Sequence, residues 1–333
     1  MTGRSRLTVC GGALLLLALL LPAAEVQAKV TRYLTGNGAD VAPALAGPAH
    51  DFGGGGTDVD AALQWIIDQV RGCTSCATKV DVVILRSTGS NGYNDYIYAM
   101  NGVDSVETLV ITSAKDSNTA AVETTVRNAE VVFFAGGDQC DYVKNFKGTR
   151  VETAVEAVYA RGGGVGGTSA GEAIQGEFTY DGCAGSAVSS QALLDPYRRD
   201  ITFTYDFFNW AHMEDVITDS HFVTRDRMGR TLAFLARQIR DGHASSALGM
   251  AVNEATSVVV DKQGLARVIG DGPAYFILAE HFPEVCEPRT PLTYSNFKIW
   301  KVAAGGTFNL ATRPTTGFYL ISVTGGALSG DPY

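Results

Sequence analysis

The stretch Arg161-Gly-Gly-Gly-Val-Gly-Gly-Thr-Ser-Ala-Gly171 joins a glycine-rich run to the pattern G-x-S-x-G at residues 167–171. This pattern is typical of a sharp turn between a strand and a helix, from which the serine hydroxyl projects. Small neighbours let the strand and the helix approach closely enough to form the turn. The helix would direct its N–H groups and positive dipole end at an oxyanion. Ser169 is therefore a candidate nucleophile; the alternative is a tight glycine turn with a solvent-facing serine.

Outward from this turn, short apolar runs that suit buried strands alternate with segments of helical periodicity. The runs are residues 80–85, 106–111 and 130–135, and the helical segments are residues 58–71, 118–129 and 150–160. The alternation predicts an α/β fold with a parallel sheet covered on both faces. Ligands in such folds bind at the carboxyl ends of strands, where Gly136-Gly137 and Ser169 both lie. The glycine run 53–56 is a loop, either near the site or on the surface.

The second half of the chain is less regular. Residues 222–240 have helical periodicity, and two short runs form a hairpin around Lys262-Gln263-Gly264. Residues 274–333 are rich in aromatic residues, threonine and glycine, which favours additional β structure. We therefore expect a catalytic α/β domain over residues 29–273 and a C-terminal extension, residues 274–333, that packs on the same domain.

The N-terminus has the features of an export signal. Arg4 and Arg6 precede a leucine-rich apolar core at residues 14–21, and Val26-Gln27-Ala28 provides small residues at cleavage spacing. We predict a signal peptide over residues 1–28 and a secreted or periplasmic protein. The alternative is a membrane anchor, but the apolar core is short for a spanning helix. After cleavage we expect no association with a membrane.

The net charge and the cysteine content limit the partners, disulfides and metal sites that we expect. The net charge of −9 leaves no basic stripe, which argues against a nucleic acid as the partner. An odd number of cysteines follows the signal, so one is unpaired or bonded elsewhere. Cys73-Thr-Ser-Cys76 ends a helical segment, which favours a local disulfide over a redox pair. Because four cysteines with metal-ligand spacing are absent from the sequence, we predict no structural zinc site.

A serine nucleophile requires a base, and the base requires an orienting group. His221 is the strongest candidate base, because it lies between an apolar pair and the segment with helical periodicity. That segment carries Arg225, Arg227 and Arg230, and arginine suits the recognition of a carboxylate. The sequence therefore indicates a pocket for an acidic substrate. The alternative is a solvated, ion-paired helix start.

Three linked motifs resemble those of a known family. They are Phe134-Ala-Gly-Gly-Asp-Gln139, Gly167-Thr-Ser-Ala-Gly171 and Asp219-Ser-His-Phe-Val-Thr-Arg-Asp-Arg-Met-Gly-Arg230. Their order and spacing resemble cyanophycinases, exopeptidases of the peptidase E family. The resemblance implies a flavodoxin-like or class I glutamine-amidotransferase-like three-layer sandwich with a mostly parallel sheet. It also implies a homodimer that hydrolyses cyanophycin, a poly-aspartate with arginine on each side-chain carboxyl, to β-aspartyl-arginine without a cofactor.

The same resemblance assigns roles to residues of this chain. It makes Ser169 the nucleophile and His221 the general base. Asn253-Glu254-Ala255-Thr256 matches the family's Asp-Glu-x-Thr stretch, which nominates Glu254 as the acidic orienter. The N–H groups of Gly137 and Ala170 are the expected oxyanion donors. The implied substrate-binding residues are Gln139, Asp219, Ser220, Arg225, Arg227 and Arg230. Ser220 stands where many cyanophycinases have glutamine, so the contacts with substrate differ at that position.

Our main hypothesis is an exported, metal-independent serine exopeptidase acting on cyanophycin. A first alternative is an enzyme of the same fold that acts on α-aspartyl dipeptides or on another β-aspartyl isopeptide. A second alternative is an envelope binding protein that has no activity. A third makes Cys140 the nucleophile, but Cys140 lacks the turn of Ser169, and a disulfide with Cys183 is favoured.

Overall fold

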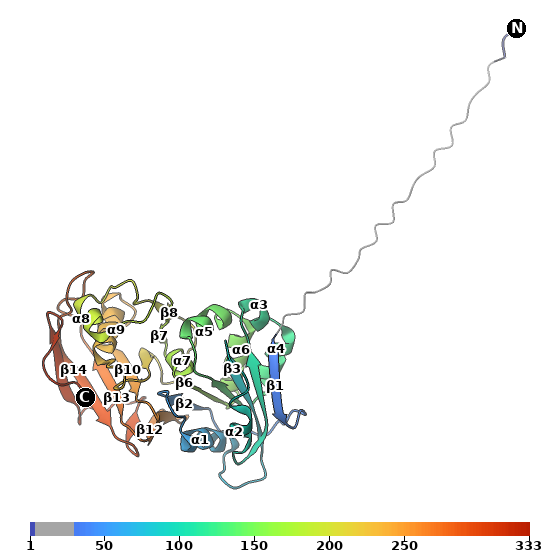
Figure 1. Ribbon diagram of the computed structural model, residues 1–333, viewed down its shortest axis with the longest axis horizontal. Coiled ribbons are helices and arrows are strands. Elements are labelled where there is room, and N and C mark those ends of the chain that lie inside the picture. The colour runs from blue at the N-terminus through green and yellow to red at the C-terminus, as the bar shows by residue number, and fades with distance from the viewer. Residues whose placement is uncertain (4–29) are drawn as a thin grey trace.

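The computed structural model describes residues 1–3 and 30–333 of the chain. Apart from its first three residues, the signal peptide predicted over residues 1–28 lies outside the described part. Two sheets stand side by side, with helices packed against them, so the predicted α/β class is confirmed (Figure 1). Within the described residues, no helix has both the length and the apolar character needed to cross a membrane.

The first sheet has nine strands in the order β1-β4-β3-β5-β6-β2-β11-β12-β15. The strands from β4 to β2 in this order pair in parallel, as the alternating pattern predicts. Strand β1 and the three strands beyond β2 add antiparallel pairs, so the sheet is mixed. The strands are β1 (Thr31–Gly36), β2 (Ala49–Gly53), β3 (Val80–Arg86), β4 (Val103–Val110), β5 (Val131–Phe134), β6 (Gly164–Thr168), β11 (Thr256–Val260), β12 (Leu265–Gly270) and β15 (Thr307–Asn309).

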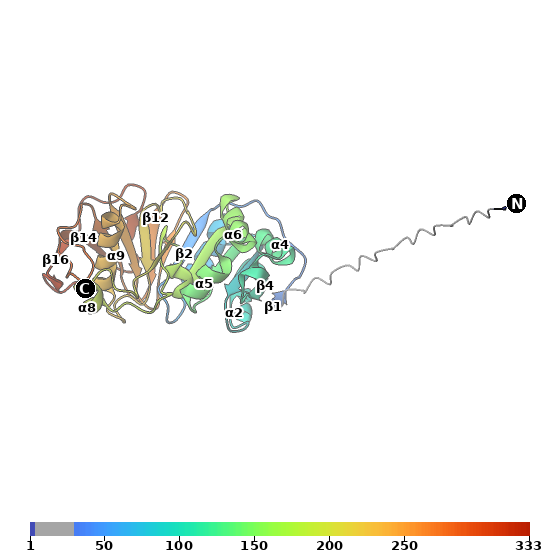
Figure 2. The same cartoon turned by 90° about the horizontal axis from the view of Figure 1, so that it is seen from above.

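Helices cover both faces of the first sheet, which gives three layers (Figure 2). Helix α1 buries its apolar side chains with strands β3 and β5 on one face, and α4, α5 and α6 contribute to a second cluster on the other face. The helices of the described chain are α1 (Asp60–Arg71), α2 (Asn94–Tyr98), α3 (Ala114–Ser117), α4 (Ala120–Asn128), α5 (Gln139–Phe146), α6 (Arg150–Ala160), α7 (Ala170–Ala173), α8 (Ser189–Leu194) and α9 (Met228–Arg240).

The second sheet has eight strands in the order β17-β16-β14-β13-β10-β9-β7-β8. Strands β7, β9 and β10 pair in parallel, and the remaining pairs are antiparallel. Helices α8 and α9 supply apolar side chains to the core of this sheet. Its strands are β7 (Phe178–Tyr180), β8 (Phe203–Tyr205), β9 (Val216–Asp219), β10 (Ala247–Val252), β13 (Ala274–Ala279), β14 (Tyr294–Val302), β16 (Tyr319–Thr324) and β17 (Ala327–Leu328).

Residues 274–333 are rich in β structure, as expected, and they join strands that precede them in the chain. Strand β13 pairs with β10 along six residues, and β15 pairs with β12 at the edge of the first sheet. The division of the chain after residue 273 stays an interpretation of the sequence, because the strands that follow it extend both sheets.

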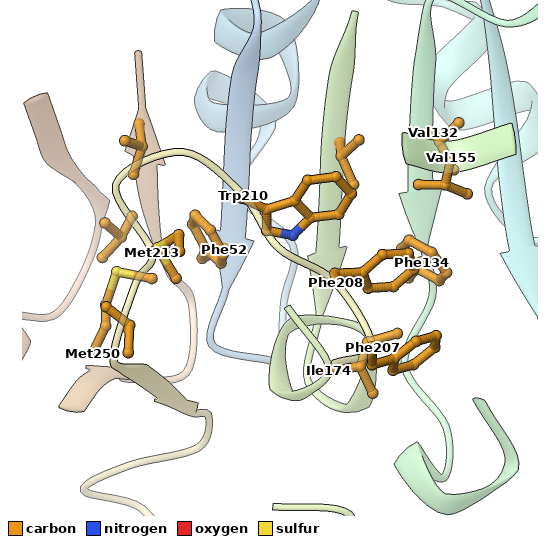
Figure 3. Packing of buried hydrophobic residues seen from close by; sticks show 14 of the residues in the cluster. Phe52, Val132, Phe134, Val155, Ile174, Phe207, Phe208, Trp210, Met213 and Met250 are labelled. Atoms are coloured by element: carbon orange, nitrogen blue, oxygen red, sulfur yellow. The ribbon is translucent and has the colours of Figure 1, made fainter. Parts of the chain in front are cut away.

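The segment between β8 and β9 carries large apolar side chains across the first sheet. Phe207, Phe208 and Trp210 are at most 3% exposed and pack with Phe52 of β2 and Phe134 of β5 (Figure 3). Burial of aromatic side chains on this scale is a large source of stabilisation. The segment therefore fixes β9, and the residues that follow it, against the parallel strands.

Within residues 30–333, the structure contains two disulfides. Cys73–Cys76 is the local bond predicted from the sequence, and Cys140–Cys183 joins α5 to the segment after β7. Because its sulfur is held in a bond, Cys140 does not present the thiolate that a nucleophile requires. Cys286 is a free, buried cysteine.

Candidate active site

Ser169 lies in a sharp turn between β6 and α7. Its backbone has φ 55° and ψ −113°, a sparsely populated conformation for a residue with a side chain. The turn needs small neighbours, because a methyl group added to Gly171 would lie 2.1 Å from the carbonyl oxygen of Phe134. The G-x-S-x-G pattern therefore forms a tight strand-to-helix turn, and Ser169 remains partly exposed at its tip.

The structure brings Ser169, His221 and Glu254 into one hydrogen-bonded series. Ser169 Oγ lies 2.7 Å from His221 Nε2, and His221 Nδ1 lies 2.6 Å from Glu254 Oε1. A carboxylate bonded to Nδ1 selects the tautomer in which Nε2 can accept the serine proton. The arrangement can thus activate a hydroxyl for attack on a carbonyl group.

The glycine run 53–56, which the sequence left unplaced, binds the backbone of Ser169, of His221 and of Ala255, the residue after Glu254. The carbonyl of Gly53 accepts from Ser169 N at 2.9 Å, that of Gly54 from His221 N at 2.7 Å, and that of Gly55 from Ala255 N at 2.9 Å. Ser169, His221 and Ala255 all have positive φ, at 55°, 46° and 51°. Conformations of this kind persist where the surrounding structure enforces them. The run is therefore a backbone template for the site.

The side-chain environment sets the ionisation of the pair. Burial lowers the pKa of His221, and the hydrogen bond to Glu254 raises it. The positive charges of Arg225 and Arg227 lower the pKa further, so the net pKa of His221 is below the ordinary value. The bond to His221 is the main cause of a lowered pKa of Glu254. A neutral imidazole beside an ionised carboxylate is the combination that a general base requires.

One expected oxyanion donor, Ala170, directly follows Ser169, and the other, Gly137, follows a glycine that lies against the turn. Ala170 is the first residue of α7, so its N–H group has no acceptor within the helix. The Gly136-Gly137 loop lies against the turn, because a methyl group added to Gly136 would lie 3.6 Å from Ser169 Cβ. Both glycines follow the end of β5, next to β6 in the sheet.

The arginine-rich segment differs from the sequence-based expectation. Helix α9 begins at Met228 and not at residue 222, so Arg225 precedes it and Arg227 is its N-cap. The hydroxyl of Tyr333 accepts from Met228 N at 2.9 Å and lies 3.0 Å from Asp226 Oδ1. The apolar side chain at 222 packs in the core instead of starting the helix, which explains the misleading periodicity.

Two of the three arginines are bound within the protein. Arg230 is 3% exposed and donates to both carboxylate oxygens of Asp219, through Nε to Oδ2 at 2.8 Å. Arg227 donates to Asp219 Oδ1 at 3.2 Å and to the carbonyl oxygen of Ser220 at 2.8 Å. The prediction that all three arginines form a substrate pocket is thus corrected: Arg230 and Asp219 are a buried pair behind the site, and Arg225 is exposed.

The remaining predicted residues lie around this centre. Gln139 is the first residue of α5 and is partly exposed. Ser220 is buried directly before His221, with its hydroxyl 3.4 Å from Arg227 Nη1. Burial and the contact with Arg227 make Ser220 part of the support for the histidine.

The sequence interpretation did not identify Glu172, three residues after Ser169. Its carboxyl group is fully buried, and within the described residues neither oxygen has a hydrogen-bond partner. Burial, reinforced by the negative charge of Asp219, raises its pKa well above the ordinary value, which favours the neutral form of the group. An acidic residue in the short helix after Ser169 is visible in the sequence, but its burial is not.

Comparison with known proteins agrees with this geometry. The profile of peptidase family S51 matches residues 88–195, a region that includes Ser169. A cyanophycinase from Nostoc sp. (strain PCC 7120 / SAG 25.82 / UTEX 2576) is 26% identical over 223 residues, which cover 65% of this chain and 69% of the relative. The chain is a serine-type peptidase, and the matched region is similar to peptidase family S51. A cyanophycinase from Synechococcus elongatus is 23% identical to this chain over 227 residues, or 66% of this chain and 65% of the relative.

Among solved structures, a peptidase from an acI-B1 Actinobacterium is similar in fold to this chain. The TM-score is 0.55, with 14% sequence identity, and the match covers 80% of this chain and 98% of the other. At this level of identity the likeness concerns the fold. The envelope binding protein without activity, considered as an alternative above, is not supported, because the matching profile is that of a peptidase family and the relatives are named cyanophycinases.

Proposed function

We propose that this serine-type peptidase is an exported exopeptidase that releases β-aspartyl-arginine from cyanophycin. Ser169 is the nucleophile, His221 the general base and Glu254 the group that orients and stabilises the imidazolium. The strand-to-helix turn acts as a nucleophile elbow, and the N–H groups of Gly137 and Ala170 stabilise the oxyanion. The signal peptide predicted from the sequence accounts for a secreted or periplasmic location.

The observation that carries the proposal is the unbroken series of short contacts from Ser169 Oγ through His221 to Glu254 Oε1, at 2.7 and 2.6 Å. In the reaction, His221 Nε2 takes the proton from Ser169 as the hydroxyl attacks the scissile carbonyl. His221 then returns the proton to the leaving amine, and water resolves the acyl-enzyme by the same route.

The substrate assignment rests on the relatives named cyanophycinase and on the cation near the base. Arg225 is exposed and close enough to His221 to lower the pKa of its imidazole. A guanidinium at that place suits the free carboxylate at the end of a poly-aspartate chain. Binding the chain end there would fix the register of cleavage and release a dipeptide.

A second candidate is a hydrolase of other aspartyl peptides. Ser220, where many cyanophycinases have glutamine, is the observation that favours it, because the side chain that supports His221 at this position differs in length and in hydrogen-bonding groups. Arginine recognition of a carboxylate serves both substrates, so only the product distinguishes the two candidates.

The test incubates the purified protein with cyanophycin, with and without a metal chelator, and identifies the product by mass spectrometry. We expect β-aspartyl-arginine in both incubations. Hydrolysis of β-aspartyl or α-aspartyl dipeptides without attack on the polymer would support the second candidate. Arg225→Ala should raise KM with the fold intact, and an unchanged KM would remove the carboxylate argument.

A further inference from the structure

The Cys140–Cys183 disulfide lies at the margin of the proposed site. Cys140 is the second residue of α5, directly after Gln139, and Cys183 belongs to the segment between β7 and α8. The start of α5 and the segment after β7 are in contact at this point, because a methyl group added to Gly182 would lie 3.1 Å from Gln139 Nε2. The disulfide therefore joins the first turn of α5 to the segment that packs against the side chain of Gln139.

The segment 181–187 is also held at its two ends. The carboxylate of Asp181 accepts from Cys183 N at 2.9 Å and from Thr204 Oγ1 at 3.0 Å. The hydroxyl of Tyr180 accepts from Ala187 N and donates to the carbonyl oxygen of Gly185, both at 2.8 Å. These bonds fix the ends and one carbonyl of the segment.

Between these ends the segment is a surface loop of small side chains. Residues 183–186 are all exposed, with the sequence Cys-Ala-Gly-Ser. A loop of this composition has few packing contacts and high conformational entropy. The disulfide is the covalent contact between this exposed stretch and α5.

The far end of the same segment reaches the buried ion pair behind His221. The carbonyl oxygen of Ala187 lies 3.5 Å from Arg230 Nη1, and Arg230 holds Asp219, two residues before His221. The segment thus connects Gln139 on one side of the site with the support of the histidine on the other. A displacement of residues 183–186 would first change the position of Gln139, because the disulfide joins this stretch to the neighbouring residue Cys140.

We propose that Cys140 and Cys183 are positioning residues, whose disulfide holds Gln139 and residues 182–186 in the arrangement that receives the substrate. The inference rests on the proposed function of the site. Breaking the bond takes two electrons and two protons and leaves two thiols, so a dithiol reductant is sufficient. The chemistry at Ser169 is unaffected by reduction, and the loss falls on KM.

The experiment compares Cys140→Ala/Cys183→Ala with a matched control, Cys73→Ala/Cys76→Ala, which removes the disulfide at the end of α1. Three quantities are measured below the unfolding temperature of both variants. They are kcat and KM on a soluble β-aspartyl-arginine oligomer, the rate of labelling by a fluorophosphonate serine probe, and amide hydrogen exchange of residues 182–186.

For Cys140→Ala/Cys183→Ala we expect kcat/KM to fall at least ~10-fold through KM, because a positioning group displaced by about 1 Å can cost up to ~100-fold. Probe labelling should stay within about threefold of wild type, and exchange of residues 182–186 should rise. The control variant should match wild type, and dithiothreitol should reproduce the loss in the control background.

Three results would overturn the inference: an unchanged kcat/KM, a loss of probe labelling equal to the loss of activity, or unchanged hydrogen exchange at residues 182–186. The exchange measurement does not depend on catalysis, so it tests the positioning even if the oligomer is not a substrate. A wild-type protein that neither reacts with the probe nor cleaves the oligomer would instead refute the proposed function.

Discussion

Replacing Gly55 by alanine should disable the site through His221. Gly55 has φ +90°, and a methyl group there would lie 2.4 Å from His221 Cε1 and 2.5 Å from Nε2. Ordinary contact begins at 3.4 Å, so the imidazole must move by about 1 Å. A shift of this size in the direction away from Gly55 lengthens the 2.7 Å contact with Ser169 Oγ beyond hydrogen-bond range.

We expect kcat to fall ~100-fold, the cost of a misplacement of about 1 Å, which corresponds to about 2.7 kcal/mol. The positive φ adds a separate cost of about 1–2 kcal/mol to the folded state. Gly148→Ala is the matched control, because Gly148 has φ +71° and no atom within 4 Å of the added methyl group. The control therefore bears the backbone cost without the contact.

The assay measures kcat and the rate of probe labelling for both variants, at a temperature where thermal unfolding shows each to be folded. Gly55→Ala should lose both activities, and Gly148→Ala should lose only stability. If Gly55→Ala retained turnover within about threefold of Gly148→Ala, the role of the glycine run as a template for His221 would be refuted.

Three further outcomes are expected. Ser169→Ala should lower kcat by at least ~10³-fold without changing the unfolding temperature, and retained turnover would exclude serine chemistry. Because His221 acts as a neutral base and its pKa is lowered, the acid limb of kcat/KM should have its midpoint below pH 6.5, and a midpoint above that would contradict the assignment. Burial opposes ionisation of Asp219, but Arg230 and Arg227 outweigh it and lower its pKa, so this stabilisation is present at neutral pH and is lost as the pH falls through that lowered pKa. Asp219→Asn should cost about 3–5 kcal/mol in urea denaturation at pH 7, and a cost below about 1 kcal/mol would show that the buried pair is dispensable.

The parallel centre of the first sheet could be predicted from the sequence, because its signals are local. The apolar runs at 80–85 and 130–135 are too short for helices, and the periodicity at 150–160 coincides with α6. The hairpin around residue 263 likewise follows from its turn residues. The arrangement of the second sheet had no such signal, because some of its pairs, such as β10 with β13, join strands that are not consecutive in the sequence.

The residues of the site also fall into those that a local sequence signal identifies and those that it does not. Short motifs were sufficient to identify Ser169, His221 and Glu254 as candidates. Their proximity depends on the topology of the two sheets, which the motifs do not reveal. The arginines were misjudged because residue type does not reveal a buried partner: Asp219 binds Arg230 from within the core. The glycine run 53–56 could not be placed, because its role lies in carbonyl groups that every residue possesses.

The hydrogen bonds of the glycine run have a consequence for dividing or recombining this protein. Ser169 follows a strand of the first sheet, His221 follows a strand of the second, and Glu254 lies where the chain passes from β10 to β11, from one sheet to the other. Neither sheet alone carries all three reacting groups. A cut between residues 253 and 254 would leave Ser169 and His221 on one fragment and Glu254 on the other, with strands of both sheets on each fragment. Hydrolysis would then return only when the two fragments reassemble around the carbonyls of Gly53, Gly54 and Gly55.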